Sequence, residues 1–439
     1  MGDRSVTLIC YIRRTKMKVL VVGGGGREHA LIRKIKESKK VDSIACCPGN
    51  GGISYDAKCY NVSATDIDGV VNLAKEIKAD FVVVAPDDPL VAGMVDALND
   101  AGFKTFGPRA NAAIIEGSKV FSKDLMEKYN IPTAEYKVFD KAEDVIEYIK
   151  EKNEFPTVIK ADGLALGKGV IIPETLEDAI DGVKEIMEDK IFGASGNNVV
   201  VEEFLTGPEV SVLAFTDGKC VKPMVSSMDH KRALDGDKGL NTGGMGTVSP
   251  NPYYTDDVAK ECMEKIFIPT IEAMNKEGRT FKGCLYFGLM ITPKGPKVIE
   301  YNCRFGDPET QVVLPRLKTD IMDIFEAINN ETLSELDIEW SDEACTCVIM
   351  ASKGYPKSYP KGIEITGLTD GQLEGVTVYH AGTAIKDGKL VTSGGRVLGV
   401  TALGNNLQDA LNKSYDAVEK INFDGAHYRK DIGKRALNA

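Results

Sequence analysis

The sequence predicts a multidomain α/β and α+β protein with three folded parts in chain order. The first part alternates continuous apolar strands with amphipathic helices, the pattern of a doubly wound parallel sheet. The second part pairs strands across Gly-containing turns between helices, which favours an α+β core with antiparallel sheets. The third part has short strands before one helix. A length of 439 residues also suits about three domains rather than one core.

In the first part, the apolar run that begins at Met17 is the first expected strand, and the glycines that follow open a helix. The remaining expected strands lie at 43–50, 81–90 and 104–108, and the expected helices at 27–38 and 66–79. We expect this domain to cover residues 17–117. Residues 1–16 are expected to be a disordered extension, or to reflect a start upstream of the true one.

The second part is expected over residues 118–335. Its expected helices lie at 119–130, 175–189 and 256–278, and its expected strands at 155–162, 169–173, 198–205, 209–215, 220–228, 282–292 and 297–302. Asp217-Gly218 and the turn 293–295 predict two hairpins. The third part, 336–439, has expected strands at 345–352, 375–382 and 395–404 before a helix at 407–421.

The composition excludes several classes of protein. The net charge of −11 disfavours nonspecific binding of nucleic acid, and no apolar run reaches the length of a membrane helix. The ten cysteines form no C-x-x-C pair, so we expect buried reduced thiols rather than metal sites or disulfides. The first residues lack the features of a signal peptide. We expect a cytoplasmic protein without nucleic-acid or membrane partners.

Four glycines at 23–26 follow the first strand and open a helix. The loop fails the dinucleotide fingerprint, because Glu28 stands where the third glycine belongs and Asn50 where a ribose-binding acid is expected. Converging backbone N–H groups and the helix N-terminus still suit a phosphate monoester. The alternative is a tight turn without a ligand.

A second glycine-rich loop, residues 163–169, joins two expected strands. Lys160 near the strand end and Lys168 in the loop are one fixed and one mobile cation, which suits a polyphosphate. Gly169 stands where a P-loop needs Ser or Thr. The alternative is a hairpin with solvated lysines. Beyond it, an apolar strand ends at Glu202-Glu203 and an acid follows at Glu209, a pattern that suits a purine and its ribose.

The stretch VIEYNCRFGDPETQ, residues 298–311, places Glu300, Asn302 and Arg304 at a spacing of two. In a strand, residues at this spacing point to one face. A carboxylate and an amide are hard oxygen ligands of the kind that Mg²⁺ prefers, and an arginine can grip a carboxylate or phosphate. We expect Glu300 and Asn302 to hold a metal, and the alternative is a structural ion-pair corner.

These motifs together resemble the ATP-grasp superfamily and, within it, the phosphoribosylamine–glycine ligase (glycinamide ribonucleotide synthetase) family, over residues 17–435. The motifs that carry the resemblance are GGGGREHAL, PGNGG, EGSK, DGLALGKGV, VEEFLTGPEVS, DHKR, NTGGMG, SPNP and RFGDPETQ. The resemblance implies a two-lobed ATP-grasp core, with a small lobe at about 139–205. This core is implied to join glycine to 5-phosphoribosylamine with ATP and Mg²⁺ or Mn²⁺. Glycyl phosphate is the implied intermediate, glycinamide ribonucleotide, ADP and phosphate are the implied products, and purine biosynthesis is the implied pathway.

The resemblance also implies the roles of particular residues. The ATP-binding residues are Lys119, Lys160, Gly163, Gly167, Lys168, Gly169, Glu202, Glu203, Leu205 and Glu209. The glycine and acyl-phosphate site comprises Asp229, Lys231, Arg232, Arg304, Asn241, Thr242, Gly243 and Gly244, with Asp229 on the ammonium group. Phosphoribosylamine is held by Gly24, Gly25, Gly26, Arg27, Glu28, Asn50, Asp87 and Pro89. Asp307 and Glu309 are expected to fix Arg304 and its turn.

The chain departs from the family pattern at three places. Asp87 replaces a glutamate, Leu166 replaces a small residue, and the strand 282–292 carries no acidic metal ligand. The alternatives to this function are an ATP-grasp ligase with another acceptor, a nucleotide-binding regulatory module without catalysis, and a dehydrogenase. We expect a monomer or a weak homodimer.

Overall fold

The computed structural model describes residues 16–164 and 169–439, and the expected extension over 1–16 lies almost wholly outside them. The first domain has a parallel sheet, as the sequence predicted, and its five strands lie in the order β3-β2-β1-β4-β5. The strands are β1 Met17–Gly23, β2 Val41–Pro48, β3 Lys58–Cys59, β4 Phe81–Val84 and β5 Lys104–Phe106. The helices are α1 Gly26–Lys36, α2 Ile67–Ile77, α3 Asp87–Val91, α4 Met94–Asp100 and α5 Ala110–Gly117.

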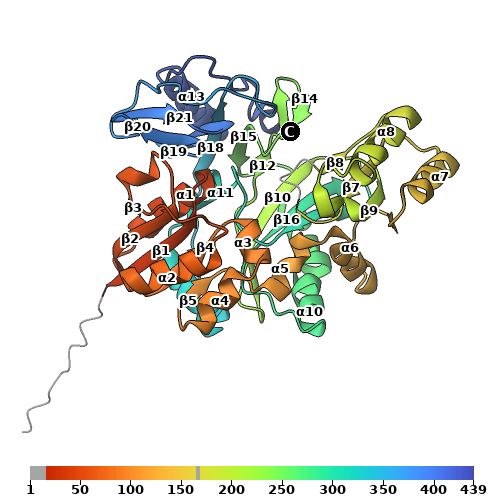
Figure 1. Ribbon diagram of the computed structural model, residues 1–439, viewed down its shortest axis with the longest axis horizontal. Helices are drawn as coiled ribbons and strands as arrows, with labels where there is room; N and C mark the ends of the chain where they lie inside the picture. Colours follow the sequence, from red (N-terminus) through yellow and green to blue (C-terminus); the bar gives the residue numbers. More distant parts are fainter. Residues whose placement is uncertain (1–15, 165–168) are drawn as a thin grey trace, which may run out of the picture.

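Helix α6 (Lys119–Lys128) leads into the two lobes of the core, which confirms the predicted two-lobed α+β arrangement. The small lobe, which projects from the rest in Figure 1, has the sheet order β6-β9-β7-β8. Its elements are β6 Tyr136–Phe139, α7 Ala142–Lys152, β7 Thr157–Ala161, β8 Val170–Ile171, α8 Leu176–Met187 and β9 Val199–Glu203. The large-lobe sheet comprises β11 Val221–Pro223, β10 Glu209–Thr216, β16 Gly283–Thr292 and β17 Gly295–Asn302.

Two expected elements of the large lobe differ from the structure. The expected helix 256–278 is divided into α9 (Asp256–Cys262), a π-helical turn and α10 (Ile268–Lys276). Pro269 follows the wide turn, and it cannot donate the backbone hydrogen bond that a continuous α-helix needs. The expected strand 220–228 ends at Pro223, and the chain then enters another sheet at β12 (Met228–Asp229).

The last sheet joins the core to the C-terminal part of the chain. Its order is β12-β15-β18-β22-β19, so strands of residues 228–249 pair with strands beyond residue 343. The other members are β15 Gly246–Ser249, β18 Ala344–Ala351, β19 Thr377–His380 and β22 Arg396–Gly404, with helix α13 Leu407–Val418 against them. Two hairpins complete this part: β13 Arg232–Leu234 with β14 Lys238–Asn241, and β20 Thr383–Lys386 with β21 Lys389–Thr392. Helices α11 Thr310–Val313, α12 Ile321–Asn330 and α14 Lys434–Leu437 also belong to the second half of the chain.

The described cysteines are free thiols, and most of them are buried, as the sequence predicted. Among the described residues, no helix combines the length and apolarity needed to cross a membrane.

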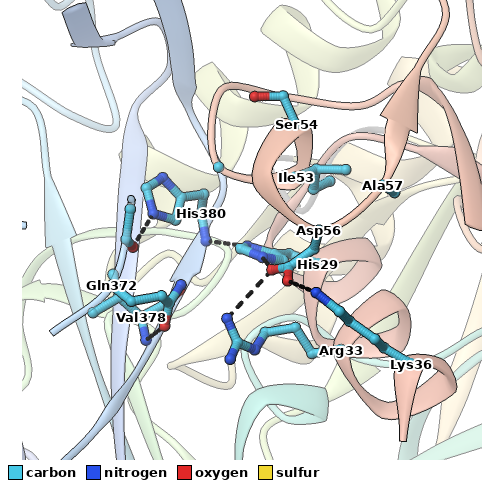
Figure 2. Close-up of polar contacts among 12 residues, drawn as sticks. His29, Arg33, Lys36, Ile53, Ser54, Asp56, Ala57, Gln372, Val378 and His380 are labelled. Carbon is cyan, nitrogen blue, oxygen red and sulfur yellow. Dashed lines mark hydrogen bonds and ion pairs between the residues drawn. The ribbon is translucent and has the colours of Figure 1, made fainter. Parts of the chain in front are cut away.

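Figure 2 shows the joint between the first domain and the C-terminal strands. His29 of α1 is fully buried, and its Nδ1 accepts the backbone N–H of His380 at 2.8 Å. Its Nε2 therefore carries the proton and lies 3.0 Å from Asp56 Oδ2, which Arg33 also contacts. The arrangement holds His29 neutral, because a proton on Nδ1 would face another N–H group.

The loop after β2 packs directly against this joint. Asn50 Nδ2 donates to the carbonyls of Gly24 and His380 at 2.9 and 2.8 Å, and the backbone N–H of Gly51 donates to Thr383. A Cβ atom on Gly52 would overlap the His380 ring. Glycine is required here by close approach rather than by an unusual backbone angle.

We predict that Gly52→Ala lowers the free energy of unfolding by about 1–3 kcal/mol, because the added methyl group overpacks a buried interface. Chemical denaturation at neutral pH measures this change. The control is Ser54→Ala, which removes an exposed hydroxyl two residues away and should change the free energy far less. Equal effects of the two substitutions would contradict the packing described for this joint.

The joint also predicts a pH dependence of stability. Burial lowers the pKa of His380 to about 3 and also lowers the pKa of His29, whereas both rings have ordinary values near 6.5 in the unfolded chain. The unfolded chain therefore binds more protons below pH 6.5, and stability falls as the pH decreases. Each histidine should cost roughly 1.4 kcal/mol per pH unit well below pH 6.5.

Denaturation at pH 7.5 and at pH 5 measures this loss. His380→Gln should reduce the slope of unfolding free energy against pH by the contribution of one proton, because one titrating ring is removed. Free energies that are equal at the two pH values would show that these rings are not held neutral.

Candidate functional site

The chain at the end of β17 carries three polar side chains where the large lobe meets the small lobe. Glu300 and Asn302 are both partly exposed, whereas Tyr301 between them is buried, so the two oxygen donors share one side of the strand. Arg304 follows, and its Nη2 donates to Asn302 Oδ1 at 3.2 Å. The three residues therefore form one group.

Lysines from three different elements surround this group. Lys160 of β7 donates to the carbonyl of Ile299 at 3.0 Å, and Lys119 at the start of α6 donates to Gly163 at 2.7 Å. Lys231, between β12 and β13, lies 3.5 Å from Glu300 Oε1. Three lysines therefore act on Glu300 within a protein whose net charge is −11.

The charges of the cleft fix the ionisation of Glu300. Burial raises the pKa of this carboxyl group, but Lys231, Lys160 and Lys119 outweigh burial and bring the pKa to about 2. The Glu300 carboxylate in turn raises the pKa of Lys231 well above its usual value, although burial opposes this. Both groups are charged at neutral pH, and the carboxylate is available as an anionic ligand.

The donors at the strand end fit a divalent metal. Glu300 and Asn302 offer one carboxylate and one amide oxygen, and both oxygens already lie beside cationic groups, Lys231 and Arg304. Among the described residues, no cluster of three or more His, Cys, Asp or Glu side chains has metal-site geometry. A Mg²⁺ ion here would therefore take its remaining ligands from phosphate and water, which is its usual preference.

Lys160 is fixed by a buried network that the sequence did not predict. The Glu202 carboxylate lies between Lys160 Nζ, at 2.9 Å, and Lys123 Nζ, at 3.0 Å. Lys123 also donates to Thr133, and burial lowers its pKa to about 8 although Glu202 opposes this. The Glu202 side chain therefore holds Lys160 in place, so any ligand contact of Glu202 would come from its backbone.

The rest of the expected nucleotide site lies along the rim of β9 and β10. Glu203 pairs with Lys297 at 2.5 Å, and Leu205 is half-buried at the edge. Glu209, the first residue of β10, lies 3.7 Å from Lys231 and is partly exposed. Gly167, Lys168 and Leu166 lie outside the described residues. Gly163 has a φ of +91°, and the carbonyl of Gly169 accepts from Ala161 at 2.8 Å.

A second acidic group lies beside Lys231. Burial raises the pKa of Asp229 well above its usual value, with the neighbouring Glu309 adding to the effect, and burial raises the pKa of Glu309 as well. A Cβ atom on Gly244 would lie 2.6 Å from Asp229 Oδ1, so the NTGGMG loop passes directly over this acid. A cation placed here would favour ionisation of both carboxyl groups.

Lys231 and Arg232, which the sequence analysis placed in one site, have different contacts in the structure. Thr242 holds the loop to Lys231, because its N–H and its hydroxyl both donate to the Lys231 carbonyl at 2.8 Å. Arg232 instead donates to the carbonyl of Gly239 at 2.8 Å, within its own hairpin. Asn241 is its partner across the hairpin, and Gly243 accepts a hydrogen bond from Arg396.

The glycine loop before α1 already satisfies two of its donors. Gly25 N–H donates to Glu28 at 2.5 Å, and Arg27 N–H donates to Asp307 at 3.3 Å. Added side chains at Gly24 and Gly26 would meet Gly49 and Gln311 at 2.5 Å, so the loop is enclosed. A phosphate at this loop would bind through its other donors or replace a carboxylate.

Asn50 and Asp87 occupy different surroundings. The Asn50 side-chain amide donates to the carbonyls of Gly24 and His380. Its oxygen accepts the backbone N–H groups of Gly52 and Ile53 at 2.9 Å each. Asp87 faces the cleft beside the buried Pro89, 3.8 Å from Arg304 Nη2. Burial raises the pKa of Asp87, but Arg304 and Arg27 outweigh it and lower the value.

The turn after Arg304 is held differently from our expectation. Glu116 and Asp87 contact Arg304, at 2.9 and 3.8 Å, whereas Asp307 pairs with Arg396 at 3.5 Å. Glu309 accepts from Tyr286 at 3.2 Å. Asp307 and Glu309 were expected to fix Arg304. This expectation is wrong for the ion pairs of Arg304, because its acidic partners are the distant residues Glu116 and Asp87. The sequence feature that could have indicated a buried role for Glu116 is its place as an acid at the end of the apolar run AAIIEG. Arg396 had no such signal.

Comparison with known proteins gives matches over nearly the whole chain. The family models for the phosphoribosylglycinamide synthetase N, ATP-grasp (A) and C domains match residues 17–116, 117–310 and 345–435. A phosphoribosylamine–glycine ligase of Caldanaerobacter subterraneus is 50% identical over 95% of this chain and 99% of its own. A crystal structure of the Thermotoga maritima phosphoribosylamine–glycine ligase has a TM-score of 0.81 and 34% identity, covering 94% of this chain and 99% of that one.

A biotin carboxylase of Campylobacter jejuni shares the fold alone. Its TM-score is 0.72 at 14% identity, and the match covers 94% of this chain and 93% of that one.

We predict that Glu300→Gln lowers kcat about 10³-fold or more, because a neutral amide cannot replace the anionic ligand. The melting temperature should change little, since the Glu300 side chain is partly exposed. The control is Glu277→Gln, which removes the partner of Lys128 and Tyr129 at the far end of α6 and should leave turnover intact. Near-normal turnover of Glu300→Gln at limiting Mg²⁺ would refute the assignment.

Proposed function

Because the chain belongs to the phosphoribosylglycinamide synthetase family, we propose that it joins glycine to 5-phosphoribosylamine with ATP, and that the cleft at the end of β17 is its active site. The chain is an ATP-dependent ligase of purine biosynthesis with an ATP-grasp core. One observation supports the location of the site above all: Glu300, Asn302 and Arg304 form one group that cations from three other elements enclose.

The chemistry requires activation of a carboxylate. The γ-phosphoryl group of ATP moves to one oxygen of the glycine carboxylate, and the bond from its phosphorus to the bridging oxygen breaks to release ADP. The amine nitrogen of phosphoribosylamine then attacks the acyl carbon of glycyl phosphate. The carbon–oxygen bond to phosphate breaks, phosphate leaves with that oxygen, and the nitrogen loses a proton. Catalysis therefore depends on positioning and neutralisation of charge rather than on a nucleophilic side chain.

The lysines and the strand-end donors bind the nucleotide in this proposal. Lys119 and Lys160 neutralise the phosphates, Glu202 fixes Lys160, and Gly163 and Gly169 lie beside the phosphates. Glu203 and Leu205 edge the adenine and Glu209 holds the ribose. Glu300 and Asn302 hold Mg²⁺ or Mn²⁺, which when bound neutralises phosphate charge.

The acids and the arginine bind glycine. Arg304 grips the carboxylate or the acyl phosphate, and its Nε is buried with no acceptor among the described residues. Asp229 receives the ammonium group, whose charge would restore ionisation of this acid. Lys231, Arg232 and the loop 241–244 complete the proposed site.

The first domain binds phosphoribosylamine. Its loop 24–28, Asn50, Asp87 and Pro89 face or support the side of the cleft opposite the small lobe. We assign residues 17–117 to this domain, 118–335 to the ATP-grasp core and 336–439 to the C-terminal domain that closes the cleft. The contact of Arg396 with Asp307 and Gly243 supports this closing role.

Free thiols among the described cysteines support a reducing compartment, and we assign the enzyme to the cytoplasm. Each site residue above lies in one chain, so a monomer or a weak homodimer would suffice.

Release of ADP tests the proposed function. We expect rapid release only when glycine and phosphoribosylamine are both present, because the second substrate draws the acyl phosphate forward. Glycine labelled with ¹⁸O in its carboxylate should deliver one labelled oxygen to the phosphate. ADP release that depends on another carboxylate or another amine would favour an ATP-grasp ligase with a different acceptor.

A further inference from the structure

Glu116 is a buried carboxylate that connects the first domain to the strand-end group. It lies in the last turn of α5, and only 8% of the residue is exposed. Its Oε2 accepts the backbone N–H of Cys303 at 2.7 Å, and its Oε1 accepts Arg304 Nη2 at 2.9 Å. One side chain therefore fixes both the backbone before Arg304 and the guanidinium group itself.

The hydrogen bonds of Arg304 show what this fixation leaves available. Its Nη2 is shared among Glu116, Asn302 and, at 3.8 Å, Asp87. Its Nε is buried and has no acceptor in the part of the chain that the structure describes. A buried guanidinium donor without an acceptor is costly, so an anionic ligand is the natural partner for that N–H group.

Burial of Glu116 is difficult to explain by stability alone. Burial raises the pKa of Glu116, and Arg304 only partly opposes that effect. Buried ion pairs contribute little net stability compared with apolar residues of the same size. Asp87 adds a further negative charge beside the same guanidinium group. What the two hydrogen bonds of Glu116 do provide is a fixed orientation for Arg304.

We propose that Glu116 is a positioning residue that aims the Nε of Arg304 at the carboxylate of glycine. This inference rests on the proposed function, since it takes glycine as the ligand of Arg304. Glu116 belongs to α5 of the first domain, whereas Arg304 follows β17 of the core. The grip on the amino acid therefore depends on a side chain from the domain that binds the other substrate.

A double-mutant cycle tests the proposal. Glu116→Gln keeps the size of the side chain but loses the charge that holds Arg304, so kcat/KM for glycine should fall roughly 50-fold, the scale of a broken buried charge pair. The KM for ATP should stay within about twofold, because Lys119 and Lys160 keep their contacts. Arg304→Lys should cost at least as much as Glu116→Gln, since lysine cannot form two parallel hydrogen bonds.

The double variant separates positioning from a merely structural role. If Glu116 acts through Arg304, adding Glu116→Gln to Arg304→Lys should cost no more than about threefold further. A multiplicative loss in the double variant would overturn the proposal, as would an equal loss of kcat/KM for all three substrates. Glu116→Asp serves if Glu116→Gln does not fold, and its shorter carboxylate should raise the KM for glycine while sparing that for ATP.

The melting temperature and a control variant give two further tests of the proposal. Glycine added with a non-hydrolysable ATP analogue should raise the melting temperature of the wild type but not of Glu116→Gln, and an equal rise in both would contradict the proposal. Glu277→Gln, an ion-pair variant far from the cleft, should behave as the wild type in every assay. Failure of the wild type to release ADP with glycine and phosphoribosylamine would instead reject the proposed function.

Discussion

The short segment 303–311 is the constraint on which the rest of the site depends, because all three parts of the chain converge on it. The first domain supplies Glu116 to Cys303 and Arg304, and it supplies Arg27 to the carbonyl of Phe305. The C-terminal part supplies Arg396, which donates to the carbonyl of Asp307 at 2.7 Å. The large lobe holds Glu309 through Tyr286. A shift of any part would move the arginine that follows β17.

Cations and carboxylates are closely paired around the end of β17. The net charge is −11, yet three lysines lower the pKa of Glu300 to about 2. The Glu202 carboxylate pairs with Lys160, and the Glu116 carboxylate pairs with Arg304. Each cation is thereby fixed before a substrate arrives, and preorganised charge is the largest source of catalysis for phosphoryl transfer.

Local patterns in the sequence predicted the architecture, the parallel sheet and the position of the strand-end group, because strand alternation and glycine turns are short-range signals. Contacts between residues distant in sequence could not be predicted. Glu116 lies 188 residues from its partner Arg304, and the two have no shared local pattern. The pairing of β12 and β15 with β18 is likewise a long-range feature. The hydrogen bond from Asn50, an expected substrate-binding residue, to the carbonyl of His380 is another such long-range contact.

The location of a bound metal and of glycine tests the central claim most directly. A crystal of the protein soaked with Mn²⁺, glycine and a non-hydrolysable ATP analogue would show both, since Mn²⁺ scatters anomalously. We expect the anomalous peak within ligand distance of Glu300 and Asn302, with the glycine carboxylate on the Nε of Arg304. A metal bound elsewhere, or glycine in a cavity that excludes Arg304, would contradict it.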